Sequence, residues 1–199
     1  TATCGPFGSA VAAGLLLGLD REQLAWALGN AGTLAAGLWQ FNLDGALSKP
    51  LHAGQAAGTG VLVAQLAARG LTGAAHILEG EHGFFAALAP QGDPTVVTQD
   101  LGTAPLAVHG ISLKPHASCR HTHAAVDAAL VVRDSLAGAP PAQVRVQVYR
   151  TALDVCDRPA PQTSAQAKFS LQFCVESARA RGHAGLEGFE GAGQDDAQV

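Results

Sequence analysis

The stretch Asp44–Ala57, DGALSKPLHAGQAA, decides how the first half of the chain is interpreted. It places Lys49 in a Ser-Lys-Pro-Leu-His turn that opens into an Ala- and Gly-rich segment, which predicts a long helix over His52–Arg69. The small residues favour close packing against other helices, and Gly70 is expected to end the helix. The chain has only three lysines, Lys49, Lys114 and Lys168.

Lys49 is the first candidate for a functional residue. Because it precedes Pro50, its backbone is biased toward extended geometry, and we expect a turn and not a helix face. A lysine held in a turn can pair with a ligand carboxylate, or act as an acid or base where it is partly buried. The alternative is a solvated loop lysine. His52, at or near the next helix start, is a candidate for substrate binding, with a polar contact at the helix end as its alternative.

Composition limits the class of protein. The 199 residues are 48% hydrophobic and 14% charged, with a formal net charge of -4, which predicts a globular chain and argues against nucleic-acid binding. No apolar run approaches the roughly 20 residues of a membrane helix.

The four cysteines form no CxxC, which indicates reduced thiols and a cytoplasmic protein. The chain begins at Thr1 without a recognisable signal peptide, and we expect it to be a piece of a longer protein.

The periodicity predicts a mostly α-helical chain with a smaller α+β part. Asp20 with Gln23 three residues later is a capping-box start for a helix that continues through Ala31. Other helices are predicted over 84–88, 124–137 and 165–181, strands over 108–113 and 144–149, and a loop or frayed tail from Gly182 onward. A loop rich in Pro and Gly over 89–104 separates the two parts. We therefore divide the chain into residues 1–105 and 106–199.

The first residues, TATCGPFGS, form a Gly-rich turn that leads into a helix N-terminus. Unbonded backbone N–H groups at such a place favour an anion, either phosphate or carboxylate. No G-K-[ST] follows, so the turn is not a P-loop. The alternative is a tight turn where helices pack closely.

A second cluster of polar residues lies between Lys114 and His123. In a strand, Cys119, His121 and His123 would share one face, which suggests zinc, but the spacing matches no standard zinc pattern and no second cluster completes a site. Without metal, Lys114, Arg120 and the histidines form a cationic clasp suited to carboxylates. The alternative is a strand-to-helix connection with polar caps. Asp127 is expected to be a cap or surface residue.

Eight short motifs, in this order, resemble those of the MmgE/PrpD family. The resemblance extends from Thr1 to about Gly182, and the order of the motifs makes it specific although each is weak alone. The motifs are TATCGPFGSA (1–10), GNAG (29–32), GLWQ (37–40), DGALSKPLHAG (44–54), ILEGEHGFF (77–85), ISLKP (111–115), CRHTHAAVD (119–127) and AKFSL (167–171).

The resemblance implies a large all-helical domain followed by an α+β lid, with an active site in the cleft between them. It also implies a homodimer, no required cofactor or metal, and a small di- or tricarboxylate substrate. The chemistry is proton transfer at a carbon next to a carboxylate, which needs fixed cations to hold the developing charge and a positioned acid or base.

The resemblance also assigns roles to individual positions. Lys49 matches the active-site lysine of the KPLH motif, Lys114 matches the lid lysine, and both are predicted to be catalytic. The predicted substrate-binding residues are Thr3, Cys4, Gly5, His52, Cys119, Arg120 and Phe173. Cys119 falls where some members carry a lid histidine, and Phe173 stands where members commonly have an active-site tyrosine.

A histidine of the family would stand immediately before Thr1, and an Asp- and His-bearing segment would lie further upstream. We therefore expect this chain alone to hold an incomplete site. The favoured function is a lyase of the 2-methylcitrate dehydratase type, as in propionate catabolism. The alternatives are a cis-aconitate-type decarboxylase, an iminodisuccinate-type epimerase, a helical fragment that only dimerises, or a metal protein built on residues 116–123.

Overall fold

The computed structural model describes residues 1–136 and 141–190, and within these ranges the chain is helical and has no β-strand. The chain divides into two compact units. Unit 1 comprises Thr1–Phe41 and Leu47–His109, and unit 2 comprises Asn42–Ala46 and Gly110–Val199. The predominantly helical fold is therefore confirmed, whereas the strands expected in the second part are absent from the described residues.

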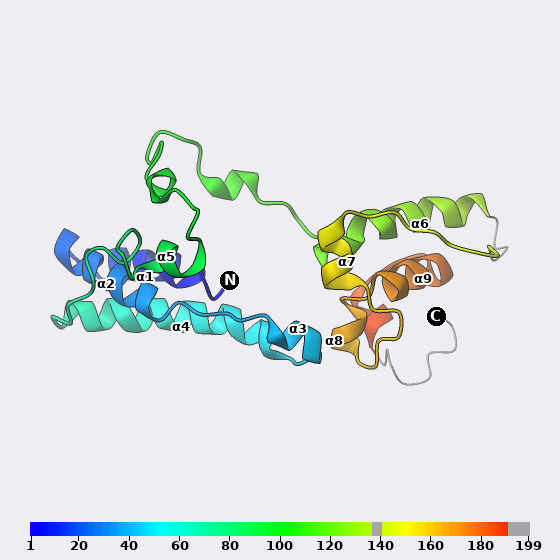
Figure 1. Cartoon of the computed structure of the whole chain (residues 1–199), viewed down its shortest axis with the longest axis horizontal. Helices are drawn as coiled ribbons and strands as arrows, with labels where there is room; N and C mark the ends of the chain where they lie inside the picture. The colour runs from blue at the N-terminus through cyan, green and yellow to red at the C-terminus, as the bar shows by residue number, and fades with distance from the viewer. Residues whose placement is uncertain (137–140, 191–199) are drawn as a thin grey trace. The chain divides into compact units, whose positions relative to one another are not determined.

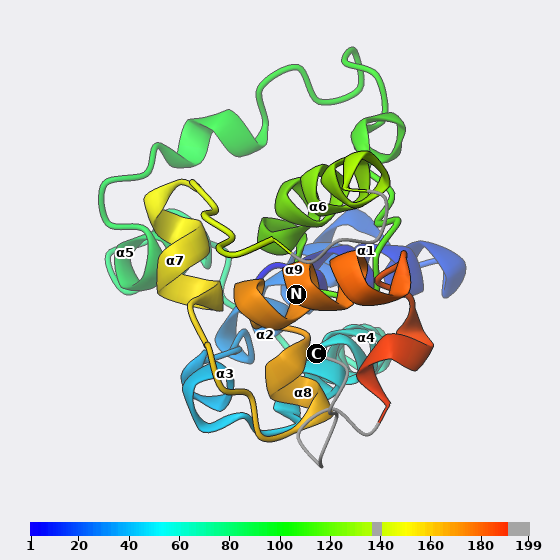
Figure 2. The same cartoon turned by 90° about the vertical axis from the view of Figure 1, so that its right-hand side faces the viewer.

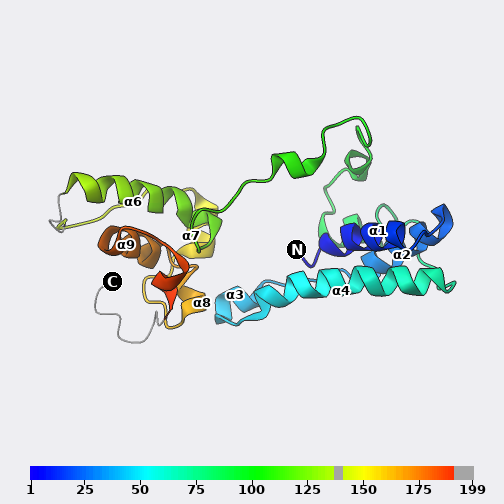
Figure 3. The ribbon, with the colours of Figure 1, turned by 180° about the vertical axis from the view of Figure 1, so that it is seen from behind.

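Unit 1 is built from three helices that lie side by side (Figures 1 and 3). They are α1 (Gly5–Leu16), α2 (Arg21–Thr33) and α4 (Ser48–Ala68). The short helices α5 (Phe84–Leu88), η1 (Pro94–Val97) and η2 (Ala107–Gly110) follow, and α3 (Gln40–Asp44) crosses the division between the units. The predicted helix over 84–88 is confirmed.

The core of unit 1 consists largely of alanine. Ala10, Ala27, Ala31, Val63 and Ala67 are almost fully buried between the three helices. Such small side chains let helix backbones come close together, so the contact depends on shape more than on the bulk of any one side chain.

The start of α2 follows the capping rule that the sequence predicts. The N–H of Gln23 donates to Asp20 Oδ1 at 2.8 Å, and the N–H of Asp20 donates to Gln23 Oε1 at 3.1 Å. Two N–H groups that the helix leaves unbonded are thereby satisfied, and the predicted capping box is confirmed.

The start of α4 corrects the predicted geometry of Lys49. The helix begins at Ser48, four residues earlier than predicted, so Lys49 lies inside its first turn and not in a turn before it. Pro50 does not prevent this, because the first N–H groups of a helix have no intrahelical partner and the missing N–H costs nothing there. The other end is as predicted: α4 stops at Ala68, and Gly70 has a left-handed backbone with φ of 89°.

Unit 2 contains η3 (Arg120–Thr122), α6 (His123–Ser135), α7 (Arg150–Cys156), α8 (Ser164–Ala167), α9 (Leu171–Arg181) and η4 (Leu186–Phe189), with α6 packed along α9 (Figures 1 and 2). The helix predicted over 124–137 is confirmed as α6, although its predicted end at residue 137 lies outside the described residues. The tail predicted to be loop from Gly182 contains η4, whose Phe189 is fully buried, and residues 191–199 lie outside the described residues.

The single helix predicted over 165–181 is two helices. Ser170 ends the first by donating its hydroxyl to the carbonyl of Arg158 at 2.6 Å, and its Oγ accepts from the N–H of Phe173 at 3.0 Å as the N-cap of α9. A serine that bonds the backbone in this way competes with helix continuation, and this explains the break.

Both predicted strands are wrong within the described residues. Val108 lies in η2, and residues 111–115 are irregular. Residues 144–149 do alternate Val with polar side chains, but no described segment pairs with them, and Val144 and Val146 stay 50% and 36% exposed. Alternation alone cannot make a strand, because the backbone groups need a neighbouring strand to bond.

The close approach of α1 and α4 gives a test of the fold. A Cβ on Gly60 would lie 2.1 Å from Ser9 Oγ and 2.4 Å from the Ser9 carbonyl carbon, whereas a Cβ on Gly58, in the same helix, would meet nothing within 4 Å. We expect Gly60→Ala to lower the free energy of unfolding by about 1–3 kcal/mol because the backbones must separate. Gly58→Ala, the matched control, should raise it by about 0.5–1 kcal/mol through helix propensity. Urea unfolding followed by circular dichroism measures both, and equal effects would contradict the close contact.

Candidate functional site

Three candidate residues of unit 1 lie at the start of α1. Thr3 Oγ1 donates to the carbonyl of Ala36 at 3.0 Å, which fixes the chain just before the helix. Cys4 is the N-cap of α1 and is exposed. A Cβ on Gly5 would lie only 2.8 Å from Cβ of Ala56, so the first turn of α1 touches α4. The Gly-rich turn therefore takes part in close helix packing, and substrate binding by Thr3, Cys4 and Gly5 stays a prediction.

Lys49 and His52 lie on α4, about two turns and one turn before that contact. With a rise of 1.5 Å per residue, Lys49 is about 10 Å along the helix axis from Ala56. Lys49 is exposed, and the half-buried ring of His52 packs edge-to-face on Phe41 with centroids 5.1 Å apart. The partial burial that an acid–base role for Lys49 would need is therefore not seen, and pairing of Lys49 with a carboxylate stays a prediction.

The candidate residues of unit 2 surround η3. Arg120 Nη1 donates to the carbonyl of Leu113 at 2.6 Å, which ties the segment carrying Lys114 to this short helix. Both Lys114 and Arg120 are exposed, and both act electrostatically on His123. Two cations of one short segment thus act on one histidine.

His116 and His123 form the centre of this group. His116 Nε2 lies 2.6 Å from Asp127 Oδ1, and the His116 ring meets the His123 ring edge-to-face with centroids 5.1 Å apart. His123 is 5% exposed; its Nε2 lies 3.3 Å from the carbonyl of Ser118, and its buried Nδ1 has no hydrogen-bond partner among the described residues. Burial lowers the pKa of His123, and the nearby cations act in the same direction.

A layer of hydroxyl and thiol groups lies close to His123. Ser118 and Thr122 bond each other through their hydroxyls at 2.8 Å, and Thr122 Oγ1 also donates to the carbonyl of Cys119 at 2.8 Å. Burial raises the pKa of Cys174 to about 11 although both hydroxyls bond it. The N–H of Cys119, itself buried, donates to the carbonyl of Lys168 at 2.8 Å. The raised pKa keeps the Cys174 thiol neutral at pH 7, and the bonds of Ser118, Thr122 and Cys119 anchor η3.

Phe173 belongs to the core of unit 2. It is 8% exposed, and its ring packs against Phe189 with centroids 5.7 Å apart. A substrate-binding role for Phe173 stays a prediction, whereas its packing role is directly visible.

Comparison with known proteins identifies the family. Residues 1–97 match the MmgE/PrpD N-terminal domain, and residues 116–199 match the MmgE/PrpD C-terminal domain. The chain belongs to the MmgE/PrpD family. It is 31% identical over 181 residues to cis-aconitate decarboxylase of Homo sapiens and 32% identical over 179 residues to that of Mus musculus. Each alignment covers 85% of this chain and 36% of the relative, so the chain spans about a third of the length of these relatives.

The geometry of this MmgE/PrpD chain corrects the basis of the zinc hypothesis. The 116–123 segment is a 3-10 turn followed by a helix and not a strand, so Cys119, His121 and His123 do not share one face. His121 instead bonds Tyr149, and Cys119 is buried. No group of three His, Cys, Asp or Glu side chains suited to a metal ion occurs among residues 1–136 and 141–190.

Two partnerships were missed by the sequence reasoning. Asp127, expected to be a cap or surface residue, is the partner of His116 across 11 positions. Tyr149 reaches His121 across 28 positions. No local pattern signals either pair, because both depend on how the chain folds back on η3.

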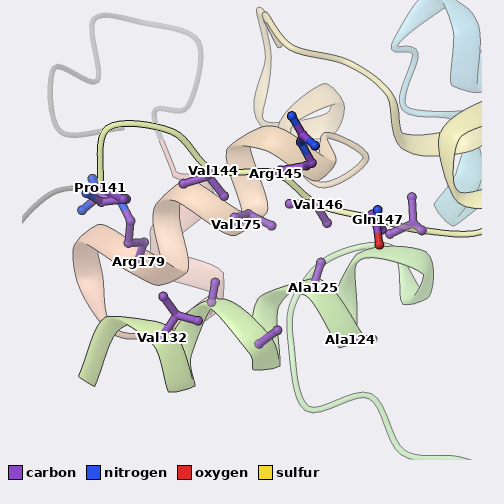
Figure 4. Close-up of a pocket in the computed structure, with 13 residues that line it drawn as sticks. Ala124, Ala125, Val132, Pro141, Val144, Arg145, Val146, Gln147, Val175 and Arg179 are labelled. Carbon is purple, nitrogen blue, oxygen red and sulfur yellow. The ribbon is translucent and has the colours of Figure 1, made fainter. Parts of the chain in front are cut away.

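An apolar hollow in the MmgE/PrpD C-terminal part contains none of the candidate residues. Its volume is about 290 Å³, and it lies between α6, α9 and the extended segment that carries Val144 and Val146 (Figure 4). Alanine and valine side chains make up most of its lining, which also includes Arg145 and Arg179, and Arg179 is bonded to Glu176. Because this lining is mostly apolar and the cationic candidate residues lie elsewhere, we place the candidate site at η3 and not in this hollow.

The buried imidazole of His123 predicts a specific pH dependence. Its pKa in the folded chain lies below the ordinary value of 6.5, so the unfolded chain binds a proton first as the pH falls. The stability that His123 contributes is therefore complete above pH 6.5 and is lost as the pH falls below it. We expect the free energy of unfolding to fall between about pH 7.5 and pH 5, and His123→Gln to reduce that slope by at most about 1.4 kcal/mol per pH unit.

Urea unfolding at several pH values measures this slope. His109→Gln, at an exposed histidine, is the matched control and should keep the slope of the unaltered chain. An unchanged slope in His123→Gln would show that His123 protonates equally in the folded and unfolded chains.

Proposed function

We propose that this chain is part of a lyase that acts on a small citrate-like di- or tricarboxylate, and that its reaction is the decarboxylation of cis-aconitate. The observation that carries the proposal is the similarity to two cis-aconitate decarboxylases over 85% of the chain. The motifs alone favour dehydration of 2-methylcitrate. Both relatives favour decarboxylation, so we place decarboxylation first and keep dehydration as the alternative.

The arrangement of charge supports a polyanionic substrate. Unit 2 holds Lys114 and Arg120 on one short segment, and unit 1 presents Lys49 at the N-terminal end of α4. Fixed cations stabilise both the carboxylates of the substrate and the negative charge that develops when CO2 leaves. A formal net charge of -4 makes these cations local features and not part of a generally basic surface.

A product assay tests the reaction in the complete reading frame that contains this chain. cis-Aconitate should release CO2, and 2-methylcitrate should lose no water at a comparable rate. Loss of water from 2-methylcitrate with no CO2 from cis-aconitate would replace decarboxylation by the alternative. Failure of citrate, cis-aconitate and 2-methylcitrate all to bind, measured by calorimetry, would overturn the proposal as a whole.

The two candidate lysines can be tested one at a time. We expect Lys49→Ala and Lys114→Ala each to lower kcat/KM by about tenfold or more, because a charge-assisted bond to a carboxylate contributes about 1.5–3 kcal/mol. Arg21→Ala, which removes an exposed cation from the start of α2, is the control and should leave kcat/KM unchanged. Circular dichroism checks that each variant is folded, and full activity in both lysine variants would remove them from the site.

We also propose that the protein is a homodimer. Large apolar side chains are exposed in unit 1, including Leu38 (86%), Leu47 (78%) and Leu51 (66%). Apolar surface of this kind is commonly covered by another protein surface. Analytical ultracentrifugation should give twice the chain mass, and Leu47→Glu with Leu51→Glu should give the monomer. A monomeric unaltered protein would contradict the proposal.

None of the described helices is long and apolar enough to cross a membrane.

A further inference from the structure

We propose that His116 is a catalytic acid–base residue of this protein, that Asp127 orients it, and that His123 positions it. The inference rests on the proposed function, because it assigns a proton-transfer role at the same carboxylate site. It is drawn from the geometry at η3 and the start of α6, where the three side chains meet.

The contact between His116 and Asp127 fixes which nitrogen is available. His116 Nε2 lies 2.6 Å from Asp127 Oδ1, and an ionised carboxylate can only accept a hydrogen bond. The proton of the neutral ring is therefore on Nε2, and Nδ1 is left as the acceptor. The described residues offer Nδ1 of His116 no hydrogen-bond partner, and 12% of the His116 side chain is exposed, whereas Nδ1 of His123 is buried. This is the arrangement of an imidazole prepared for proton transfer.

His123 holds the other side of the ring without adding charge. The two rings are at 73° to each other, so His123 packs on His116 edge-to-face. The charged groups that act on His123 are Lys114, His116 and Arg120, all cationic when protonated, and burial adds to their effect. His123 is therefore held toward its neutral form, and Asp127 lies beside His116, where the carboxylate can balance a positive charge on that ring.

The neighbouring cations place a carboxylate beside this ring. Lys114 is two residues before His116, and the bond from Arg120 to Leu113 draws both cations to one segment. In the proposed decarboxylation the bond between the substrate carbon and the departing carboxylate breaks, CO2 leaves, and its electron pair stays on carbon. The imidazolium of His116 gives its Nδ1 proton to that carbon, which forms the new C–H bond. The neutral ring then takes a proton from solvent, so charge and atoms balance.

Kinetics of the complete reading frame that contains this chain test the role of His116. We expect His116→Gln to lower kcat for cis-aconitate by about 10²–10⁴-fold with KM changed less than about threefold, because the proton donor is lost and the cations remain. Asp127→Asn should lower kcat by about tenfold or more and alter the kcat–pH profile, because the orientation of the ring is lost. His123→Gln should act through His116 and also alter that profile. His109→Gln is the control and should match the unaltered protein.

Chemical rescue separates catalysis from folding. His116→Gly should regain turnover when imidazole is added, which a purely structural loss would not show. Turnover in His116→Gln within about threefold of the unaltered protein, or absence of rescue in a folded His116→Gly that still binds cis-aconitate, would overturn the inference.

Nuclear magnetic resonance of the imidazole nitrogens gives a readout that does not need turnover. It should show His116 protonated on Nε2, and Asp127→Asn should change that state. If no tricarboxylate binds although His116 is protonated on Nε2, the proposed function is contradicted. If cis-aconitate is turned over but His116 is protonated on Nδ1, only the inference about His116 is contradicted.

Discussion

The contact between the backbones of α1 and α4 is the constraint on which unit 1 depends. Gly60 leaves room for Ser9, and Ser9 Oγ donates to the carbonyl of Ala57 at 2.9 Å, so each helix is fixed by the other. A core of alanines buries little apolar area per residue, and its stability comes from many close contacts. The same contact brings the start of α1 and the first turns of α4 together, so the position of Lys49 follows from glycine and alanine residues further along α4.

Unit 2 differs from unit 1 because it holds several cations near one another. Lys114 and Arg120 remain at the surface, where water screens their repulsion. Beneath them the histidine at position 123 is buried without charge, and Ser118 and Thr122 bond each other and the backbone. Charge therefore stays outside and neutral polar groups lie inside. In the proposed mechanism this order keeps a second cation out of the interior when the imidazole of His116 carries a positive charge.

Local chemistry was predictable from the sequence, and contacts between distant residues were not. The Asp20 capping box, the end of α4 at Gly70 and the helix over 84–88 each depend on a few adjacent residues. The strand expected over 144–149 failed because no described segment pairs with it, and alternation carries no information about a partner. The cationic group at η3 was predicted from its spacing, whereas the pairing of His116 with Asp127 needed the fold.

Lys49 lies in the first turn of α4 and not in the turn that the sequence predicts before the helix. The N-terminus of a helix carries a partial positive charge, so a lysine in the first turn costs about 0.3–1 kcal/mol where an acidic residue would stabilise the helix. No acidic residue lies in the first turn of α4, and Lys49 adds a second positive charge to that end. In a chain with three lysines this placement is unfavourable for the helix alone. The carboxylate substrate that we propose would be favoured at this helix end, because the helix N-terminus and Lys49 are both positive there.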